Sequence, residues 1–558
     1  VDGGRRIRPA PARPRRAPTD GESLMGARGL LAAGCALLLG LTAGCGGPGA
    51  GGPADAPIER VEATLRVLAG SELADMGPVL AELEAETGVR LELEYEGTLQ
   101  ATKELISDDE GGWDLAWLPS GRYLSLLPES EGLVSESASI MRSPVVLGLK
   151  PEAAASLGWS EQSPPEWQEV LDAAAAGRLR FGMTNPVASN SGFLTLLQSA
   201  TALSGNGTAL QRDDVAAVSP QLSRLAAGHA LTSGSSGWLL ESFQEDPEAV
   251  DGLFAYESTL RGVQLDGAPL TLLIPSDGVI TSDYPLMLLD GADETTQRAY
   301  RAAVDYLSRA EVQQRIADTT GRRTSATPPE ADARVFELPF PANLETVHEL
   351  LSAWLSSIKK PSDMVFGIDT SGSMGEGDRM QQLRNALAVL TGEREPEGGG
   401  FLRLQPRERI TLLEFGEATK SHFTVEVPAD AAGRTQAMAQ LAAYIDGFVP
   451  EGDTSIYSTA QQAYERALVG AAEGRLASIV LFTDGENTAG TTRQEFEAWH
   501  AAYAAQNPGA ADIPVHTIVF GEADAEAMAA LSELTGGRSF DARTAPLDEV
   551  FEEIRGYL

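Results

Sequence analysis

Hydroxyl and carboxylate side chains follow apolar segments at three places in the C-terminal third of the chain. Asp369, Ser371 and Ser373 come directly after the apolar run MVFGI, and Asp484 follows the run SIVLFT. Thr454 precedes an amphipathic stretch that begins near residue 456. If the apolar runs are parallel strands, their carboxyl ends meet at one edge of the sheet, where ligands bind in open α/β folds. Oxygen donors of this kind are the ligands that Mg²⁺ prefers.

The order D-x-S-x-S, then Thr, then Asp resembles the metal-ion-dependent adhesion site (MIDAS) of von Willebrand factor A domains, over residues 362–558. The resemblance implies a doubly wound, Rossmann-like α/β domain that binds Mg²⁺ (or Mn²⁺ or Ca²⁺). It further implies direct coordination by Ser371, Ser373 and Thr454, with Asp369 and Asp484 holding metal-bound waters. A partner protein would then complete the metal shell with an acidic group. The alternative interpretation is that these residues only cap strand and helix ends.

Without a cation, we expect Asp369 and Asp484 to face each other with little to offset their repulsion. Removing one of them would then stabilise the empty domain slightly.

A second group of small polar residues lies in the middle of the chain, and several of its members precede predicted helices. The group comprises Ser71, Thr98, Ser189, Asn190, Ser191, Ser235 and Ser236. Helix N-termini offer unpaired N–H groups to a small anion. Each residue alone is equally well explained as a helix cap or turn residue, but together they predict a ligand pocket. No Arg or Lys lies within these segments, which argues against a bulky phosphorylated ligand.

The segments LAGSE, YEGT, TNPVASNSGF, SGSSGW, YES and SDYPLMLL resemble the extracellular solute-binding proteins of ABC importers, particularly the two-lobed class that takes oxyanions. The resemblance implies a two-lobed, periplasmic-binding-protein-like domain that closes around a small solute at a hinge.

Short apolar runs alternate with amphipathic stretches in both regions. In the middle region, TLRVLAG, RLELEYEG and WDLAWLP predict strands, and the stretch from residue 72 predicts a helix that ends at Gly88. This rhythm predicts a largely parallel sheet with right-handed crossovers. In the C-terminal region, continuous apolar strands indicate a sheet that is covered on both faces.

The N-terminus reads as a secretion signal. Residues 29–43 form an apolar run after Arg28 that is short for a bilayer span and typical of a signal-peptide core. The run ends in LTAGC (residues 41–45), which resembles the bacterial lipobox and implies cleavage before Cys45 and its lipidation. A Gly/Pro-rich tether then begins. We therefore expect a protein that is lipid-anchored on the extracytoplasmic face of the cell membrane.

The chain of 558 residues is too long for one hydrophobic core. We divide it into a signal region with an upstream extension (1–44), a lipidated tether (45–60), a solute-binding-protein-like domain (61–326), a Pro-rich linker and helix (327–361) and a von Willebrand factor A domain (362–558). The net charge of -38 argues against a nucleic-acid partner. Both cysteines, Cys35 and Cys45, lie in the N-terminal segment, so none remains downstream for a disulfide or thiolate site.

We predict a binding protein rather than an enzyme. The chain has no H-x-x-x-H pair and no G-x-x-x-x-G-K motif. The first hypothesis is a surface lipoprotein whose cation site captures a partner, with the solute-binding-like domain as sensor. The alternative is the solute-binding component of an ABC importer for a small solute, with an accessory von Willebrand factor A domain.

Overall fold

The computed structural model describes residues 58–107, 112–392, 403–543, 550 and 554. The predicted signal region, most of the tether and the lipidation residue Cys45 lie outside these residues. Within the described ranges, no helix is both long and apolar enough to cross a membrane.

The first lobe of the middle region is built on a five-stranded sheet with strand order β2-β1-β3-β13-β4. Its strands are β1 (Ala63–Gly70), β2 (Val89–Glu96), β3 (Leu115–Trp117), β4 (Val134–Ser139) and β13 (Pro285–Leu289). The helices are η1 (Ser71–Met76), α1 (Gly77–Thr87), α2 (Thr98–Ile106), η2 (Leu124–Leu126), η3 (Pro128–Ser130), α9 (Glu294–Leu307) and α10 (Ala310–Thr320). Successive strand residues face opposite sides, so Val67 packs with α1 and α9 while Leu68 packs with α2.

The second lobe has a sheet of order β11-β5-β8-β6-β7, with β12 paired to β5. Its strands are β5 (Ser143–Leu149), β6 (Phe181–Thr184), β7 (His229–Ser233), β8 (Gly252–Tyr256), β11 (Thr271–Leu273) and β12 (Thr281–Ser282); β9 (Gln264–Leu265) and β10 (Ala268–Pro269) form a separate hairpin. The helices are α3 (Pro151–Leu157), α4 (Trp167–Ala175), α5 (Asn190–Ser204), α6 (Arg212–Ala226), α7 (Ser236–Glu245), η4 (Pro247–Ala249) and α8 (Glu257–Arg261).

Both lobe sheets are mixed rather than largely parallel, which corrects the sequence prediction. In the first lobe, β13 runs antiparallel to β3 and β4, and in the second lobe β5 runs antiparallel to β8 and β11. In the first lobe, the chain leaves after β4 and returns through β13, so strands from separate passages are paired. In the second lobe, β5 pairs with β8 and β11, which follow more than a hundred residues later in the same passage.

Three chain segments connect the lobes and lie side by side. They run from β4 to β5, from β12 to β13, and onward from the end of α10, and Arg142 and Arg323 of two of them exchange backbone hydrogen bonds. Tyr284, in the second segment, has φ 40° although it is not glycine. A buried tyrosine in the left-handed region is a costly conformation that the surrounding structure must enforce.

The Pro-rich stretch carries the short helix α11 (Pro329–Asp332), and the predicted helix after it appears as α12 (Leu344–Ala353), continued by a π-helical turn, η5 (Trp354–Ile358). Val347, Leu350 and Trp354 of this helix pack into the core of the second lobe, mainly against α6.

The C-terminal domain has a six-stranded sheet of order β16-β15-β14-β17-β18-β19, in which only the edge strand β16 is antiparallel to its neighbour. The strands are β14 (Ser362–Asp369), β15 (Arg409–Phe415), β16 (Thr419–Glu426), β17 (Leu476–Thr483), β18 (Val515–Val519) and β19 (Ser539–Asp541). The helices are η6 (Gly372–Gly375), α13 (Arg379–Thr391), α14 (Ala431–Asp446), α15 (Ile456–Ala472), α16 (Arg493–Gln506), η8 (Pro508–Ala510) and α17 (Ala525–Leu534).

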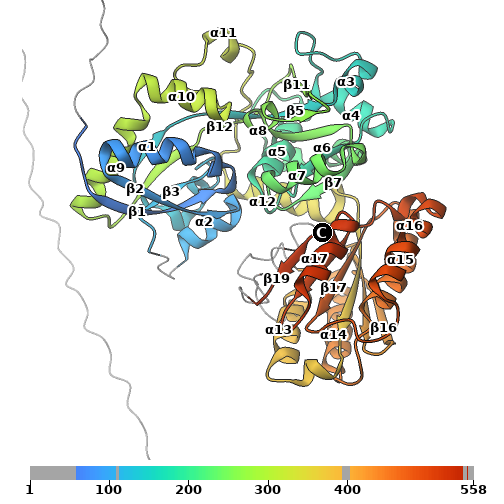
Figure 1. Ribbon diagram of the computed structural model, residues 1–558. Coiled ribbons are helices and arrows are strands. Elements are labelled where there is room, and N and C mark those ends of the chain that lie inside the picture. The colour runs from blue at the N-terminus through green and yellow to red at the C-terminus, as the bar shows by residue number, and fades with distance from the viewer. Residues whose placement is uncertain (1–57, 108–111, 393–402, 544–549, 551–553, 555–558) are drawn as a thin grey trace, which may run out of the picture. The chain divides into compact units, whose positions relative to one another are not determined.

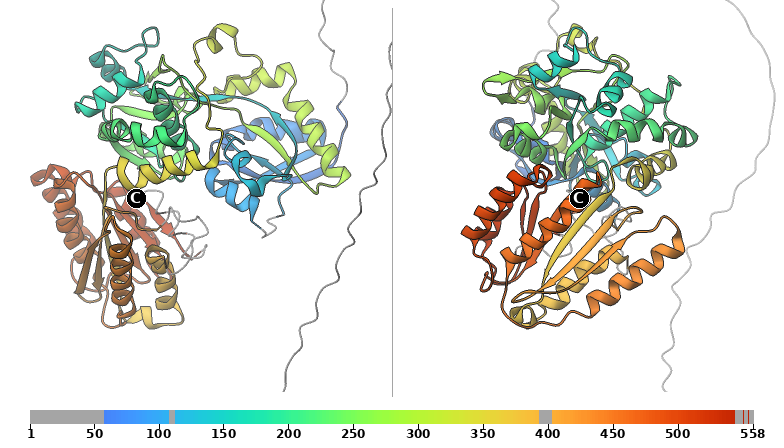
Figure 2. Two further views of the ribbon diagram at one scale, coloured as in Figure 1. Left: turned by 180° about the vertical axis from the view of Figure 1, so that it is seen from behind. Right: turned by 90° about the vertical axis from the view of Figure 1, so that its right-hand side faces the viewer.

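Helices cover both faces of this sheet, as the sequence predicted (Figures 1 and 2). Phe366 of β14 packs with α13 and α14, and the neighbouring Val365 packs with α15, α16 and α17 on the other face. Successive strands are added on opposite sides of β14, with β15 on one side and β17 on the other. The place where the strand order reverses, between β14 and β17, is the switch point of the sheet. Doubly wound sheets bind ligands at the carboxyl ends of the strands there.

Candidate functional site

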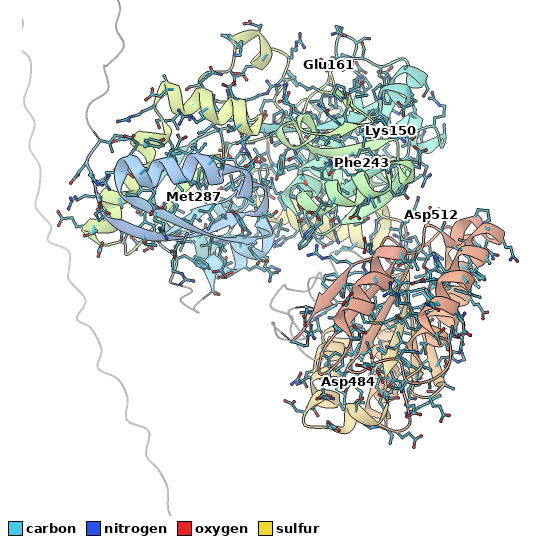
Figure 3. The ribbon with its side chains drawn as sticks, in the orientation of Figure 1. Lys150, Glu161, Phe243, Met287, Asp484 and Asp512 are labelled. Atoms are coloured by element: carbon cyan, nitrogen blue, oxygen red, sulfur yellow. The ribbon has the colours of Figure 1, made fainter. Side chains whose placement is uncertain are left out.

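The five residues predicted to hold a cation come together at the switch point of the C-terminal sheet. We call Asp369, Ser371, Ser373, Thr454 and Asp484 the strand-end cluster. Asp369 is the last residue of β14, and Asp484 directly follows β17, the strand paired with it. Both carboxylates are fully buried, and Figure 3 labels Asp484 at the lower edge of the domain in that view.

Hydrogen bonds connect four of the five cluster residues, Asp369, Ser371, Ser373 and Asp484. Oδ1 of Asp369 accepts the backbone N–H of Ser371 at 2.8 Å. The hydroxyls of Ser371 and Ser373 lie 3.0 Å apart, and the Ser373 hydroxyl donates to Oδ1 of Asp484 at 2.8 Å. Oδ2 of Asp369 accepts from the hydroxyl of Thr483 at 2.8 Å. The carboxylates are therefore held in one orientation by neighbouring donors.

Thr454 is positioned by backbone hydrogen bonds to two neighbouring loops. Gly372 N donates to Gly452 O, which ties the Thr454 loop to the loop after β14. Thr488, four residues beyond Asp484, accepts the backbone N–H of Thr454 through its hydroxyl oxygen at 3.0 Å and donates its own backbone N–H to Thr454 O at 2.9 Å. Thr454 is 5% exposed. All three cluster loops are thus joined to one another.

Burial sets the electrostatics of Asp369. Loss of hydration raises the pKa of its carboxyl to about 6, hydrogen bonds from Ser371 and Thr483 oppose the rise, and the charge of Asp484 adds to it. An ionised carboxylate in this position therefore gains from any nearby positive charge.

The donor set fits a hard divalent cation. It consists of three hydroxyls and two carboxylates, all oxygen ligands, which suit Mg²⁺ better than a soft transition metal. The backbone of Gly485 also leaves space between two of these donors. A Cβ at this position would lie 3.5 Å from the Ser373 hydroxyl oxygen and 3.7 Å from that of Thr454. Nowhere in the described ranges do three or more His, Cys, Asp or Glu side chains gather as a metal-binding group.

The sequence prediction missed a cation beside the cluster. Nη1 of Arg379, at the start of α13, donates to Oδ2 of Asp484 at 2.8 Å and approaches Ser373 O at 3.4 Å. The expectation that little offsets the repulsion between Asp369 and Asp484 is therefore wrong. Arg379 lies ten residues after Asp369, and the path of the segment between them is not readable from local sequence, so no pattern indicated this ion pair.

Asn487 is a second residue that the prediction missed. Its Oδ1 accepts from Ile456 N at 2.8 Å and from Tyr457 N at 3.4 Å, so it caps the N-terminus of α15 from another loop. The cap fixes the helix that follows Thr454. The sequence signal was the run TDGENT, in which the polar residues continue beyond Asp484.

The residues predicted to bind a solute lie near the facing sides of the two lobes. Helix α7, which begins at Ser236, packs against η1, which begins at Ser71. A Cβ on Gly97, just before Thr98, would lie 2.8 Å from Ala188 O, just before Ser189. The structure thus brings the helix N-termini of both lobes together in pairs.

Several of these side chains already have partners inside the second lobe. The Ser191 hydroxyl, fully buried, lies 2.8 Å from that of Thr184 and 2.9 Å from that of Ser236. Ser235 caps α7 by accepting from Trp238 N. Asn190 donates to the Tyr256 hydroxyl at 2.9 Å and to Ser282 Oγ at 3.1 Å.

Charged groups that the sequence segments did not reveal lie beside these residues. Arg322 pairs with Asp75 of the first lobe at 2.6 Å, and the adjacent Arg323 binds Glu257 of the second lobe through two nitrogens, at 2.7 and 3.0 Å. Both arginines lie in the segment that follows α10, far from the predicted motifs in sequence. Each lobe is therefore held to the same connecting segment by an ion pair; the Arg323–Glu257 pair is buried, whereas the side chain of Asp75 is 41% exposed.

Glu72 and Tyr284 add buried polar atoms near the segments that connect the lobes. Oε1 of Glu72 and the hydroxyl of Tyr284 are buried and have no hydrogen-bond partner among the described residues. Burial raises the pKa of Glu72, and burial together with the charge of Glu72 raises the pKa of Tyr256 and Tyr284. A surface pocket on the first lobe, lined partly by Arg122, contains none of the sequence-predicted residues.

Two protein families match consecutive parts of the chain. The family described as bacterial extracellular solute-binding protein matches residues 65–319, and the von Willebrand factor type A domain matches residues 363–553. The two matches agree with the two-lobed region and the doubly wound domain.

Known proteins resemble the chain at low identity. Uncharacterized proteins of two Mycobacterium tuberculosis strains are 24% identical over 477 residues, which cover 80% of this chain and 68% of theirs. The periplasmic binding protein P5PA aligns with 53% of this chain and 100% of its own, at 16% identity and a TM-score of 0.41. A von Willebrand factor type A structure from Catenulispora acidiphila aligns with 36% of this chain and 43% of its own, at 17% identity and a TM-score of 0.27.

Proposed function

Since the chain joins a bacterial extracellular solute-binding domain to a von Willebrand factor type A domain, we propose that it is a membrane-anchored extracytoplasmic binding lipoprotein. Its C-terminal domain captures an acidic group of a partner protein through a divalent cation at the strand-end cluster. The observation that carries this proposal is the convergence of two buried carboxylates and three hydroxyls at the switch point between β14 and β17.

Each cluster residue has a part in holding the ion. The hydroxyls of Ser371, Ser373 and Thr454 would hold it, and Asp369 and Asp484 would orient its waters. A bound Mg²⁺ or Mn²⁺ supplies an electrophilic position that an acidic group can fill. The Thr483 hydroxyl and Ser371 N–H keep the Asp369 carboxylate turned toward the cluster. Binding of this kind requires no catalytic residue.

The two-lobed domain serves as a sensor for a small solute in this proposal. Support comes from the paired helix N-termini at the lobe faces and from the connecting segments, where Tyr284 holds a strained backbone conformation. Buried groups such as Glu72 and Asn190 would orient the solute by hydrogen bonds. The alternative function is delivery of that solute to an ABC importer, which the match to the solute-binding family favours.

The anchor is tested separately because Cys45 lies outside the described residues. We expect Cys45→Ser to release the processed protein from the membrane fraction. Retention of processed Cys45→Ser protein after a salt wash would remove the lipid anchor from the proposal.

Thermal melting of the full chain tests the cation site. Ligands that bind only the native state raise its stability by RT ln(1 + [L]/Kd). We expect Mg²⁺ to raise the melting temperature of the wild type relative to chelator, and to leave Asp369→Ala unchanged. A wild-type melting curve that ignores millimolar Mg²⁺ and Mn²⁺ would end the cation proposal.

A further inference from the structure

Arg379 is a positive charge built into the strand-end cluster. Its side chain is only 19% exposed, and its guanidinium lies 2.8 Å from Oδ2 of Asp484, whose side chain is fully buried. The other oxygen of Asp484 accepts from Ser373. Each carboxylate oxygen of Asp484 therefore has a donor within the protein.

We propose that Arg379 is an internal counter-cation that occupies Asp484 and weakens binding of the divalent cation until an acidic group of the partner adds negative charge. The inference rests on the proposed function, because it assigns a role toward the same cation. It concerns how the affinity of the cluster for the cation is regulated, a property that the five predicted residues do not determine by themselves.

The charge balance of the cluster supports this role. Asp369 and Asp484 together contribute two negative charges, and Arg379 reduces their sum to one. A divalent cation then makes the whole group positive, with Arg379 and the ion competing for the same carboxylate. Like charges repel strongly where water is largely excluded. A carboxylate from a partner restores neutrality. The ion therefore binds more tightly when the acidic group is bound, and the acidic group binds more tightly when the ion is bound.

The neighbouring backbone leaves room for the guanidinium. Gly521 has φ +60°, and a Cβ there would lie 3.1 Å from Nε of Arg379 and 3.1 Å from Cβ of Asp484. Any larger residue would press on both members of the pair. The glycine thus permits the close approach of Arg379 to Asp484.

A second acceptor lies within reach of Arg379. Oε2 of Glu376, a residue on the surface, is 4.0 Å from Nη2 of Arg379, and its side chain is 73% exposed. When an ion and an acidic group fill the cluster, the guanidinium can shift its interaction from Asp484 toward Glu376 or toward the acidic group itself. Arginine suits this exchange because its planar fork of donors pairs with carboxylates in several geometries.

Another cation close to the cluster has a different role. Lys420 of β16 donates from Nζ to Thr370 O at 2.7 Å and to Val449 O at 3.1 Å. It joins two loops through their backbone carbonyls and forms no described ion pair with the cluster carboxylates. Arg379 is therefore the group whose charge acts on Asp484 directly.

Calorimetric titration of Mg²⁺ into the full chain tests the proposal. We expect Arg379→Gln to bind Mg²⁺ about tenfold or more tightly than the wild type, a ratio that corresponds to about 1.4 kcal/mol. Arg379→Lys keeps the charge and should stay near the wild type. Arg493→Gln removes a cation of the same domain that pairs with Glu497 on the surface, and it serves as the matched control. Arg379→Met is a second neutral variant in case Arg379→Gln does not fold.

The outcomes separate the two proposals. Tighter binding by the neutral variants, with Arg379→Lys and Arg493→Gln unchanged, supports the counter-cation. If the wild type binds Mg²⁺ and both neutral variants bind it equally or more weakly, the counter-cation proposal is overturned. Arg379 then only positions Asp484, and the metal site itself stands. No binding by the wild type or by any folded variant overturns the metal site and the counter-cation together.

Discussion

Replacing Gly485 by Ala tests whether the space beside this residue holds a cation, because the substitution should weaken cation binding without lowering the stability of the fold. The added methyl group would lie 3.5 Å from the Ser373 hydroxyl oxygen and 3.7 Å from that of Thr454, which are ordinary van der Waals distances. The φ of Gly485 lies outside the left-handed region, so Ala is not strained there. We expect the ion-free protein to keep its stability or to gain up to about 1 kcal/mol, because Ala lowers the entropy of the unfolded chain.

The same methyl group should disturb the cation. Mg²⁺ binds oxygen at about 2.0–2.1 Å and keeps several waters. An ion in contact with the hydroxyls of Ser373 and Thr454, together with its waters, needs the space that the methyl group fills. We therefore expect Gly485→Ala to weaken Mg²⁺ binding by at least about tenfold, or 1.4 kcal/mol.

The assay combines urea denaturation in chelator with calorimetric titration of Mg²⁺. Gly509→Ala is the matched control, since a Cβ there meets only Leu468, at 3.7 Å, away from the cluster. If Gly485→Ala binds Mg²⁺ like the wild type, the ion does not lie between the two hydroxyls. A large loss of stability in chelator would instead show that the loop cannot accept the methyl group, contrary to the contact distances.

Three further predictions follow from single side chains. Asn190→Ala removes two buried hydrogen bonds, to Tyr256 and Ser282, and should cost about 1–3 kcal/mol in urea denaturation; an unchanged midpoint would refute this. Asn487→Ala should cost about 1 kcal/mol, because α15 loses its N-terminal acceptor, and should weaken Mg²⁺ binding; calorimetry that matches the wild type would argue against a role for that cap. Burial, aided by the charge of Arg538, lowers the pKa of His516 to about 4, below its unfolded value near 6.5. The neutral imidazole of His516 is therefore tolerated in the folded state above pH 6.5. As the pH falls from 6.5 toward 4, the unfolded state takes up a proton that the folded state does not, and the free energy of unfolding decreases by up to about 3 kcal/mol. His516→Gln should flatten the pH dependence of denaturation in that interval, and an unaltered slope would contradict the assignment.

Most of the C-terminal fold could be predicted from the sequence, because its strands are continuous apolar runs with polar residues at their ends. The run from Met364 to Asp369 lies within β14, and the run that ends at Thr483 is β17. The middle region was harder to predict. Its chain crosses between the lobes, so strand direction depends on pairings between segments far apart in sequence, such as β13 with β3. Local periodicity contains no information on such pairings.

The candidate site divides in the same way. Residues that lie at strand ends, such as Asp369 and Asp484, could be identified from their position after apolar runs. Arg379 and Arg322 could not, because each reaches its partner from a segment whose path is set by tertiary packing. The strained φ of Tyr284 likewise depends on the surrounding lobes and leaves no local sequence signal.

Uptake of Mn²⁺, followed by the electron paramagnetic resonance signal of the free ion, tests the central claim most directly. We expect the wild-type chain to remove one Mn²⁺ per molecule from solution, excess Mg²⁺ to release it, and Asp369→Ala to leave the free signal unchanged. A wild type that leaves millimolar Mn²⁺ free, or an Asp369→Ala variant that takes up as much Mn²⁺ as the wild type, would contradict a cation site at the ends of β14 and β17.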